Sequence, residues 1–381
     1  MPQRTSVFPI IGIIGGGQLA RMLIQQGQKV GFSFQLLCKD ENDPAAQVLG
    51  RRDITFGDPN KIQDLMQFLP KATHITFESE FVMVHQIQTA LLRLAERKVK
   101  DPHYFFPSLS CMEIFQDRLT QKTLLETFRI PTAPFLYSED PLEIQSFFQL
   151  HKKVVFKKRM GGYDGYGTFI IQSKTDLAAF LKKNDPNEFI CESFIPFQEE
   201  LACSFARNQN GQFISFPLVQ TVQKDNKCDS VFGPVKHSNF ALMSQKISKV
   251  LTQIDYVGLI TFEFFNANQK LLVNEVAPRV HNSAHYSLDA LSIDQFLAHL
   301  KSGLGLDYAS PTQFMKYFAM TNLIYLPESK LVNQKFISGK LHWYGKTEIR
   351  PGRKMGHINY LANNSDILKQ ALQERKKLYE K

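Results

Sequence analysis

The first part of the chain alternates short apolar runs with amphipathic segments. Gln18–Gln26 has helical spacing, and apolar runs typical of buried parallel strands occupy Phe8–Ile14, Phe32–Cys38 and His74–Phe77. Asp43 and Pro44 have the character of an N-cap and first residue, so they predict the start of another helix. This alternation predicts a doubly wound, Rossmann-like sheet for a first domain over residues 1–114.

The pattern changes twice after that domain. Residues 115–197 begin with a helical pattern and continue into an apolar strand and a glycine-rich hairpin, which predicts a second, smaller domain. From residue 198 to 381 the pattern predicts antiparallel strands at Ala202–Ala206, Phe213–Val219, Gly258–Phe265 and Lys270–Val276. The expected fold class is therefore α/β in the first domain and α+β in the other two.

Composition narrows the classes of protein that need to be considered. The 381 residues are 43% hydrophobic and 21% charged, and no apolar run approaches the ~20 residues that span a bilayer. The first residues do not resemble a signal peptide, and five scattered cysteines suggest neither a zinc site nor a disulfide framework. We therefore expect a cytoplasmic protein without a membrane partner.

The net charge of +9 does not by itself indicate nucleic acid. Basic residues are mostly interspersed with acidic ones, and no RNA-recognition or zinc-finger signature is present. Local basic clusters occur at 152–159, 346–354 and 375–377. The first two suit small phosphorylated ligands better than a polymer, whereas the third suits a solvated terminal helix.

The glycine-rich segment Lys157–Gly167 is typical of a phosphate cradle. An apolar strand delivers a lysine and then four glycines, at 161, 162, 165 and 167. Glycines let backbone N–H groups approach anionic oxygens, and the lysine adds a charge. The segment does not have the spacing of a Walker A loop.

A second glycine cluster, Gly15–Gly17, lies between the first strand and the first helix. Its spacing matches a dinucleotide fingerprint, which makes an NAD-dependent dehydrogenase one interpretation. A tight strand–helix turn and a phosphate site for another ligand at the helix N-terminus are the other two. The residues of this block do not decide among the three.

Two carboxylates in a predicted hairpin indicate a metal site. If the chain turns near Gln269, Glu263 lies opposite Glu275 on one face, where like charges among apolar neighbours are unfavourable. A Mg²⁺ ion between them would remove this cost, and Asn274 offers a further oxygen. The alternative is that both glutamates face water.

Two further polar segments are candidates for anion binding. Pro278–His285 contains an arginine, an asparagine and two histidines, which suit an anion-plus-Mg²⁺ site better than zinc. Lys346, Arg353 and Lys354 lie within nine residues near the chain's one tryptophan, which indicates either a second phosphate site or an ordinary basic turn.

Taken together, six segments resemble one family. They are G-G-G-Q-L-A-R-M at 15–22, D-P-A-A-Q-V at 43–48, D-R-L-T-Q-K at 117–122, K-K-R-M-G-G-Y-D-G-Y-G at 157–167, N-E-V-A-P-R-V-H-N-S at 274–283 and R-K-M-G-H at 353–357. The chain resembles the N(5)-carboxyaminoimidazole ribonucleotide synthetases, which are ATP-grasp ligases of purine biosynthesis. The resemblance implies an ATP-grasp fold behind a Rossmann-like domain, ATP and Mg²⁺ as cofactors, 5-aminoimidazole ribonucleotide and bicarbonate as substrates, and a homodimer. Biotin is not implied.

The resemblance also assigns roles to residues of this sequence. Nucleotide contacts would come from Arg118, Lys157, Gly162, Tyr163, Asp164, Gly165, Tyr166, Gly167, Thr168, Glu192, Ser193, Phe194, Ile195, Glu200, Gln223, Asn274 and Glu275. Mg²⁺ would bind Glu263 and Glu275. The bicarbonate and ribonucleotide site would contain Arg279, His281, Asn282, Lys346 and Arg353, helped by Gln18. The chain departs from the family pattern at Ala20, Gln223, Ala284 and Tyr286.

Three alternatives differ in what they predict. Another ATP-grasp ligase, such as formate-dependent glycinamide ribonucleotide transformylase, would share the ATP site but differ at 279–285 and 346–357. A dehydrogenase would bind a nicotinamide cofactor at 15–20. A non-catalytic nucleotide-binding relative is disfavoured because Lys157, Glu263 and Glu275 are all present.

Overall fold

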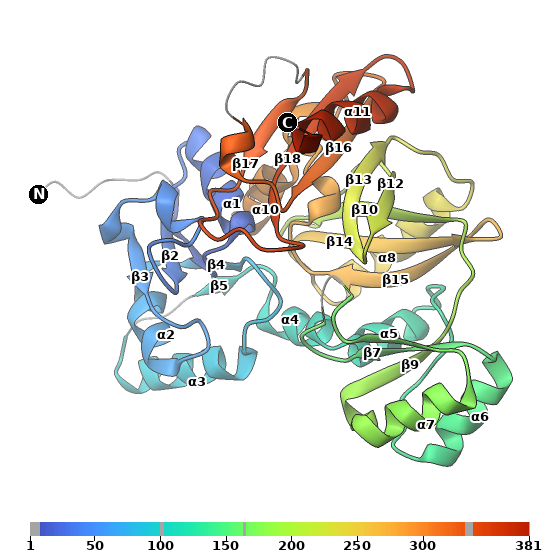
Figure 1. The fold of residues 1–381 in the computed structure, drawn as a ribbon. Coiled ribbons are helices and arrows are strands. Elements are labelled where there is room, and N and C mark those ends of the chain that lie inside the picture. The colour runs from blue at the N-terminus through green and yellow to red at the C-terminus, as the bar shows by residue number, and fades with distance from the viewer. Residues whose placement is uncertain (1–7, 100–102, 163–164, 332–337, 381) are drawn as a thin grey trace, which may run out of the picture.

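The computed structural model describes residues 8–99, 103–162, 165–331 and 338–380. In this part of the chain the strands form three sheets, which Figure 1 displays as a blue N-terminal domain, a green small domain and a large yellow-to-red region. The expectations for Tyr163 and Asp164 lie outside the described residues. No helix among the residues that can be described has the length and apolar character required to cross a membrane.

The N-terminal sheet is parallel, with the strand order β3-β2-β1-β4-β5. Its strands are β1 (Ile11–Ile14), β2 (Phe34–Cys38), β3 (Ile54–Phe56), β4 (His74–Phe77) and β5 (Tyr104–Phe105). Ile13 packs in the cluster that contains α1 (Gln18–Lys29), whereas Ile14 packs with α2 (Ile62–Phe68) and α3 (Val84–Glu96). Both faces are therefore covered, and the predicted doubly wound sheet is confirmed.

Three local predictions in this domain differ from the structure. The first strand begins at Ile11 rather than at Phe8, and the second begins at Phe34 rather than at Phe32. The helix expected after Asp43 is only a 3-10 turn, Ala46–Val48. The Asp43 carboxylate instead accepts hydrogen bonds from the backbone N–H of Lys39, at 2.9 Å, and of Asp40, at 3.3 Å, so it ties together the loop after β2.

The small domain is a four-stranded antiparallel sheet in the order β6-β9-β7-β8. Its elements are β6 (Phe135–Leu136), α6 (Pro141–His151), β7 (Val154–Lys158), β8 (Thr168–Ile171), α7 (Lys174–Lys183) and β9 (Phe189–Ser193). Phe156 stacks on Phe180 with 4.1 Å between ring centroids, which fixes α7 against the sheet. Because β7 pairs with β8, the predicted glycine-rich hairpin is confirmed.

The large antiparallel sheet follows the order β15-β14-β10-β12-β13-β16-β18-β17, and β11 pairs with β10. Its strands are β10 (Glu199–Arg207), β11 (Phe213–Ser215), β12 (Val219–Lys224), β13 (Lys227–Gly233), β14 (Gly258–Ala267), β15 (Lys270–Ala277), β16 (Tyr317–Ile324), β17 (Lys340–Trp343) and β18 (Lys354–Ala362). The single strand expected over Phe213–Val219 is wrong, since the chain leaves β11 before Pro217. Proline has no backbone N–H to donate to a ladder.

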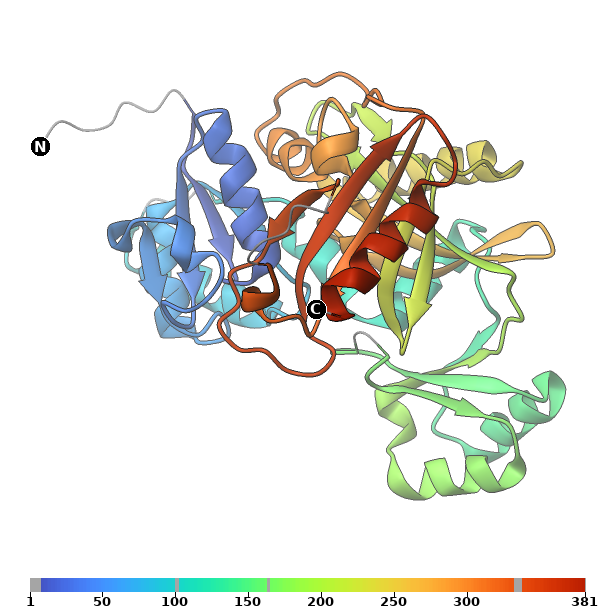
Figure 2. The ribbon, with the colours of Figure 1, turned by 45° about the horizontal axis from the view of Figure 1, so that its top comes forward.

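The helices of this region join and cover the sheets. They are α4 (Leu109–Gln116), α5 (Arg118–Thr127), α8 (Phe240–Gln253), α9 (Ser287–Ala290), α10 (Gln295–Gly303) and α11 (Ile367–Glu380). Asp117 ends α4 and caps α5 by accepting from the N–H of Leu119 at 2.9 Å. In Figure 2 the red α11 lies across the C-terminal strands, while the green small domain projects below the large sheet. The small domain and the β14–β15 hairpin thereby face each other across the site described next (Figure 1).

Candidate active site

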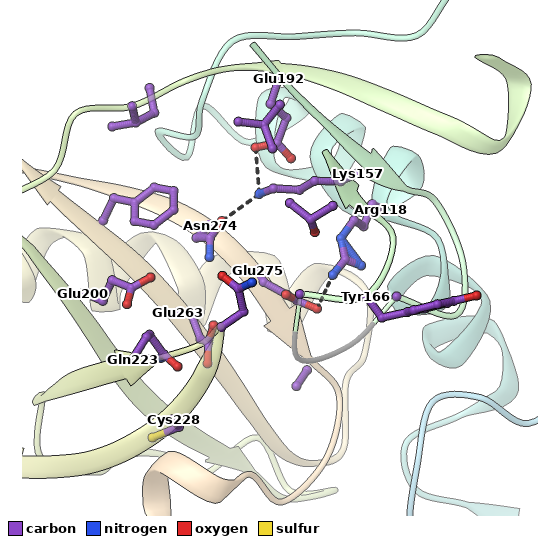
Figure 3. Close-up of a pocket in the computed structure, with 18 of the residues that line it drawn as sticks. Arg118, Lys157, Tyr166, Glu192, Glu200, Gln223, Cys228, Glu263, Asn274 and Glu275 are labelled. Carbon is purple, nitrogen blue, oxygen red and sulfur yellow. Dashed lines mark hydrogen bonds and ion pairs between the residues drawn. The ribbon is translucent and has the colours of Figure 1, made fainter. Parts of the chain in front are cut away.

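A cavity of about 490 Å³ lies between the small domain and the large sheet, and Glu80 of the N-terminal domain also lines it. Figure 3 shows the side chains that point into it from both sides. The cavity gathers most of the residues expected from sequence: Arg118, Lys157, Gly162, Gly165, Tyr166, Thr168, Glu192, Ser193, Phe194, Ile195, Glu200, Gln223, Glu263, Asn274, Glu275, Arg279, His281 and Asn282. Of the described residues that were expected here, Gln18, Gly167, Lys346 and Arg353 lie outside this lining.

The two glutamates of the hairpin are directly opposed. β14 and β15 pair Glu263 with Glu275, as predicted, but a bulge after Glu263 produces this register. Val273 is buried in the core, Asn274 and Glu275 both line the cavity, and Val276 is buried again. The bulge thus places two consecutive polar side chains on the cavity side of β15.

The hairpin offers oxygen ligands that fit Mg²⁺. The carboxylates of Glu263 and Glu275 are 29% and 35% exposed, and Asn274 stands beside them. Within the described residues no group of three His, Cys, Asp or Glu side chains could form a metal cage. Two carboxylates with room for water and phosphate oxygens suit a Mg²⁺ ion that arrives with a nucleotide.

Two cations of the site are held in place by acidic and amide partners. The Lys157 ammonium donates to Glu192 Oε2 at 3.0 Å and to Asn274 Oδ1 at 2.8 Å, and Arg118 donates to Glu275 Oε1 at 2.8 Å (Figure 3). Burial acts to raise the pKa of Glu192, but the lysines at 122 and 157 outweigh it and hold that pKa below its usual range. Glu192 is therefore ionised, and it orients Lys157.

One end of the cavity is apolar enough to accept a planar ring. Val155, Ile170 and Phe194 line it with Phe197 and Phe265, whose rings stack with centroids 4.5 Å apart. Glu200 and Gln223 also line the cavity, on strands β10 and β12. Burial raises the pKa of the Glu200 carboxyl. Apolar walls with a few polar groups are typical of a site for a nucleobase and its ribose.

Arg279 links the cavity to the N-terminal domain. Its guanidinium forms a bidentate ion pair with Glu80, with one N–O distance of 2.9 Å. Burial acts to raise the pKa of Glu80, but Arg279 outweighs it, so this carboxylate is ionised. Sequence reasoning missed Glu80, although Glu78 and Glu80 directly follow β4, and the carboxyl ends of parallel strands are where ligand sites form.

His281 contributes a neutral ring to the site. Burial lowers its pKa well below the usual value, and the nearby charges of Arg279 and Lys354 act in the same direction. The ring lies 3.7 Å from Glu263 Oε1 through Nε2, and its Nδ1 is 2.9 Å from Ser283 Oγ. Asn282 is fixed by a reciprocal amide pair with Asn322, at 3.0 and 2.7 Å.

Two of the glycines at 15–17, Gly15 and Gly17, lie against the carboxyl group of Glu78. Glu78 accepts hydrogen bonds from the N–H of Gly17 at 2.6 Å and of Leu19 at 3.4 Å, at the N-terminus of α1. A side chain at Gly17 would collide with this carboxylate, since an added Cβ would lie 2.0 Å from Glu78 Oε1. The Glu78 carboxyl group already occupies the position where a dinucleotide would place its pyrophosphate, so the dehydrogenase interpretation loses its site.

Lys346 and Arg353 belong to the C-terminal loop, by which we mean residues 344–353 between β17 and β18. Lys346 donates to the carbonyl of Lys354 at 2.7 Å, and Arg353 pairs with Glu348 at 2.8 Å. The loop contacts the N-terminal domain where Gln47 Nε2 donates to the Gly345 carbonyl at 2.6 Å. Lys354, rather than Lys346 or Arg353, is the cation of this segment among the described residues that line the cavity.

Comparisons with known proteins agree with this architecture. Residues 9–116 match the ribonucleotide synthetase preATP-grasp domain, residues 123–296 the ATP-grasp domain, and residues 319–371 the phosphoribosylaminoimidazole carboxylase C-terminal domain. The N5-carboxyaminoimidazole ribonucleotide synthase of Saccharolobus solfataricus is 33% identical over 96% of this chain and 94% of its own. The enzyme of the same name from Synechococcus elongatus is 34% identical over 97% and 94%. The chain belongs to the N5-carboxyaminoimidazole ribonucleotide synthase family.

Solved structures of this family extend the agreement to three dimensions. The N5-carboxyaminoimidazole synthetase of Staphylococcus aureus, complexed with ADP, has a TM-score of 0.86 at 28% identity and covers 97% of both chains. The enzyme of Aspergillus clavatus, in complex with ADP and 5-aminoimidazole ribonucleotide, has a TM-score of 0.84 at 25% identity over 98% of both chains. The ATP-grasp fold expected from sequence is thereby confirmed.

Three of the four positions that were expected to depart from the family pattern lie in the core. Ala20 and Ala284 are buried, and Tyr286 stacks on Phe318 with 4.1 Å between centroids while its hydroxyl donates to the Pro217 carbonyl at 3.1 Å. Gln223 is the departure that lines the cavity. The residues at 20, 284 and 286 therefore contribute to packing, and Gln223 lines the cavity.

Proposed function

We propose that this synthase carboxylates 5-aminoimidazole ribonucleotide with bicarbonate, using ATP, to give N5-carboxyaminoimidazole ribonucleotide, ADP and phosphate in purine biosynthesis. The observation that carries the proposal is a single cavity that brings together Arg118 and Lys157, the opposed Glu263 and Glu275, and Arg279 from beside the N-terminal domain. The relatives carry the name of this activity, and the A. clavatus structure contains both ADP and the ribonucleotide.

The nucleotide would lie with its base against the apolar end of the cavity. The segment Glu192–Ile195 would meet the adenine through its backbone, and Glu200 would hold the ribose, with Gln223 beside it. Arg118 and Lys157 would contact the phosphates, covered by the loop that contains Gly162, Gly165, Tyr166, Gly167 and Thr168. Arg118 and Lys157 have further N–H donors, so they could contact phosphate while keeping their bonds to Glu275, Glu192 and Asn274.

Glu263 and Glu275 would hold Mg²⁺, with Asn274 as a neighbouring oxygen. The ion supplies neutralisation of the charge that develops as the γ-phosphoryl group transfers. The contribution of the protein is the opposed pair of carboxylates, which would be costly to keep side by side without a cation.

The chemistry activates bicarbonate before the amine attacks. A bicarbonate oxygen attacks the γ-phosphorus, ADP leaves, and carboxyphosphate forms. The exocyclic amine then bonds to the carboxyl carbon, either of carboxyphosphate or of the CO₂ that it releases; phosphate leaves, and the nitrogen loses a proton. Carboxyphosphate is short-lived in water, so the glycine-rich loop would act as a lid. Arg279 would hold the anion, while the neutral His281 offers hydrogen bonds without adding charge.

The ribonucleotide would bind between the N-terminal domain and the large sheet. Arg279, His281 and Asn282 would face its base, and Lys346 and Arg353 of the C-terminal loop would hold its phosphate, helped by Gln18. For this the loop would have to exchange the Arg353–Glu348 pair for a contact with phosphate. We further propose that the chain works as a cytoplasmic homodimer and has domains at 1–114, 115–197 and 198–381.

The test is the dependence of ADP formation on each substrate. ADP release should require 5-aminoimidazole ribonucleotide together with bicarbonate, and the product should contain carbon from labelled bicarbonate. Equal or greater turnover with formate and glycinamide ribonucleotide would assign the chain to a different ATP-grasp reaction. ATP binding without turnover under any of these conditions would favour a non-catalytic relative.

A further inference from the structure

Lys122 is a buried lysine that the proposed chemistry does not use. It follows Arg118 by one helical turn on α5, yet its side chain is only 3% exposed, and it is absent from the described residues that line the cavity. Its ammonium lies 3.3 Å from Glu192 Oε2, 2.5 Å from Thr132 Oγ1 and 3.4 Å from the Val273 carbonyl oxygen. These three partners come from three separate segments and match the three donors of an ammonium group.

Glu192 is shared between Lys122 and Lys157. Both ammonium groups meet the same oxygen, Oε2, at 3.3 and 3.0 Å, whereas Oε1 is buried without a hydrogen-bond partner among the described residues. One carboxylate balances one positive charge, so this buried trio carries a net charge of +1. The excess lies next to the cavity, because Lys157 and Glu192 line it and Lys122 lies behind them.

We propose that Lys122 is a positioning residue for nucleotide binding, which keeps Lys157 available to the phosphates by taking part of the Glu192 carboxylate. This rests on the proposed ATP site. Without Lys122, Glu192 would neutralise Lys157 alone, and the trio would change from +1 to zero. The cavity would attract a polyphosphate less, although every residue that contacts the nucleotide would still be present.

The protonation of Lys122 gives the proposal a signature. Burial lowers the pKa of this lysine to about 8, although Glu192 opposes the shift. Lys157 on β7 and Arg118 on its own helix act with burial, while β15 and the segment at 132 contribute only a carbonyl and a hydroxyl. A bound polyphosphate favours the charged form. Nucleotide affinity should therefore be full below pH 8 and fall as the pH rises above it.

The experiment measures binding of ATP and, separately, of the ribonucleotide by calorimetry between pH 7 and pH 9.5. For Lys122→Met we expect ATP to bind roughly tenfold more weakly at pH 7.5, from the loss of one nearby charge, while the affinity for the ribonucleotide stays within about twofold. The alkaline fall in ATP affinity should be present in the wild type and absent in the variant. Lys249→Met, which removes an exposed lysine from α8, is the matched control and should match the wild type.

A second measurement needs no folded variant. At pH 8, ATP binding to the wild type should take up a fraction of a proton, seen as a difference in binding heat between buffers of unlike ionisation enthalpy. No proton uptake, an alkaline fall that persists in Lys122→Met, or equal losses for ATP and the ribonucleotide would overturn the proposal. Binding is measured without turnover, so an enzyme that binds ATP but does not carboxylate would refute the proposed function and leave this test intact.

Discussion

Two pairs of basic residues carry the same charges but differ in where their partners lie. One pair is Arg118 and Lys157, and the other is Lys346 and Arg353 of the C-terminal loop. The first pair line the cavity and are oriented by Glu275, Glu192 and Asn274, which also line it. The second pair bond to acceptors of their own segment, Glu348 and the Lys354 carbonyl. Under the proposed roles, the ATP phosphate site is already assembled, whereas the ribonucleotide phosphate site requires Arg353 to leave Glu348.

This difference predicts different responses to substitution. Removing a side chain that is already positioned for its ligand removes the whole of that side chain's contribution to binding. A group that must first leave another partner contributes only the difference between the two contacts. The four predictions below use this contrast, in order of decreasing expected effect.

Substitution of one metal-binding candidate should have the largest effect. Glu263→Gln should slow phosphoryl transfer by several kcal/mol in activation free energy, on the order of 10³-fold or more, because charge neutralisation in the transition state weakens. Single-turnover measurement of ADP formation over a Mg²⁺ series checks this. Glu126→Gln, at an exposed position of α5, should behave as wild type. Near-normal rates for Glu263→Gln at ordinary Mg²⁺ concentrations would show that the hairpin does not hold the Mg²⁺ needed for phosphoryl transfer.

Arg353→Ala should weaken ribonucleotide binding by about 1.5–3 kcal/mol, the scale of a hydrogen bond to a charged group, and should leave ATP affinity unchanged. Each ligand is titrated separately against the variant. Glu348→Gln is the informative partner, because it frees Arg353 from its ion pair and should tighten ribonucleotide binding. If both variants weaken it equally, Arg353 only supports the loop.

Gly165→Ala tests whether ATP binding and ribonucleotide binding are independent of each other. Gly165 has φ +80°, and an added Cβ would lie 2.5 Å from Asn226 Cβ; Gly161 has φ +73° with nothing within 4 Å. Left-handed backbone costs a non-glycine residue about 1–2 kcal/mol, so Gly161→Ala measures the strain and Gly165→Ala adds the collision. We expect weaker ATP binding in both variants, more so at 165, with ribonucleotide affinity retained. A parallel loss of ribonucleotide affinity would mean that the two are coupled.

The smallest effect should come from the contact that anchors the C-terminal loop. Gln47→Ala removes the hydrogen bond to the Gly345 carbonyl, worth about 0.5–1.5 kcal/mol. The KM for the ribonucleotide should rise by a few-fold and that for ATP should not change. A change in the KM for ATP alone would mean that the loop acts on ATP binding and not on ribonucleotide binding.

Features set by neighbouring residues could be predicted from the sequence, whereas contacts between distant segments could not. The carboxylate pair, the glycine hairpin and the parallel first domain come from local patterns, and the structure confirms them. Contacts between distant segments could not be read in this way, which is why Glu80 beside Arg279 and the partners of Lys122 were missed. The expected helix after Asp43 failed because its side chain bonds backward to Lys39 and Asp40.

The register of the β14–β15 hairpin could be predicted only in part. The β14–β15 turn consists of Asn268 and Gln269, and a regular ladder from it would place Asn274, not Glu275, opposite Glu263. The pairing was predicted, but the bulge that produces it was not. A bulge depends on where one extra residue relaxes best, and alternation along a single strand does not reveal that position.

The bulge makes Asn274 one extra residue in an otherwise regular hairpin. Removing that one residue would restore regular alternation, with Val276 still buried and Glu275 still facing Glu263. A chain shortened by Asn274 should therefore keep its hairpin and its carboxylate pair while losing the orientation of its lysine. In this strand the extra residue adds a polar side chain to the cavity without replacing a residue of the core.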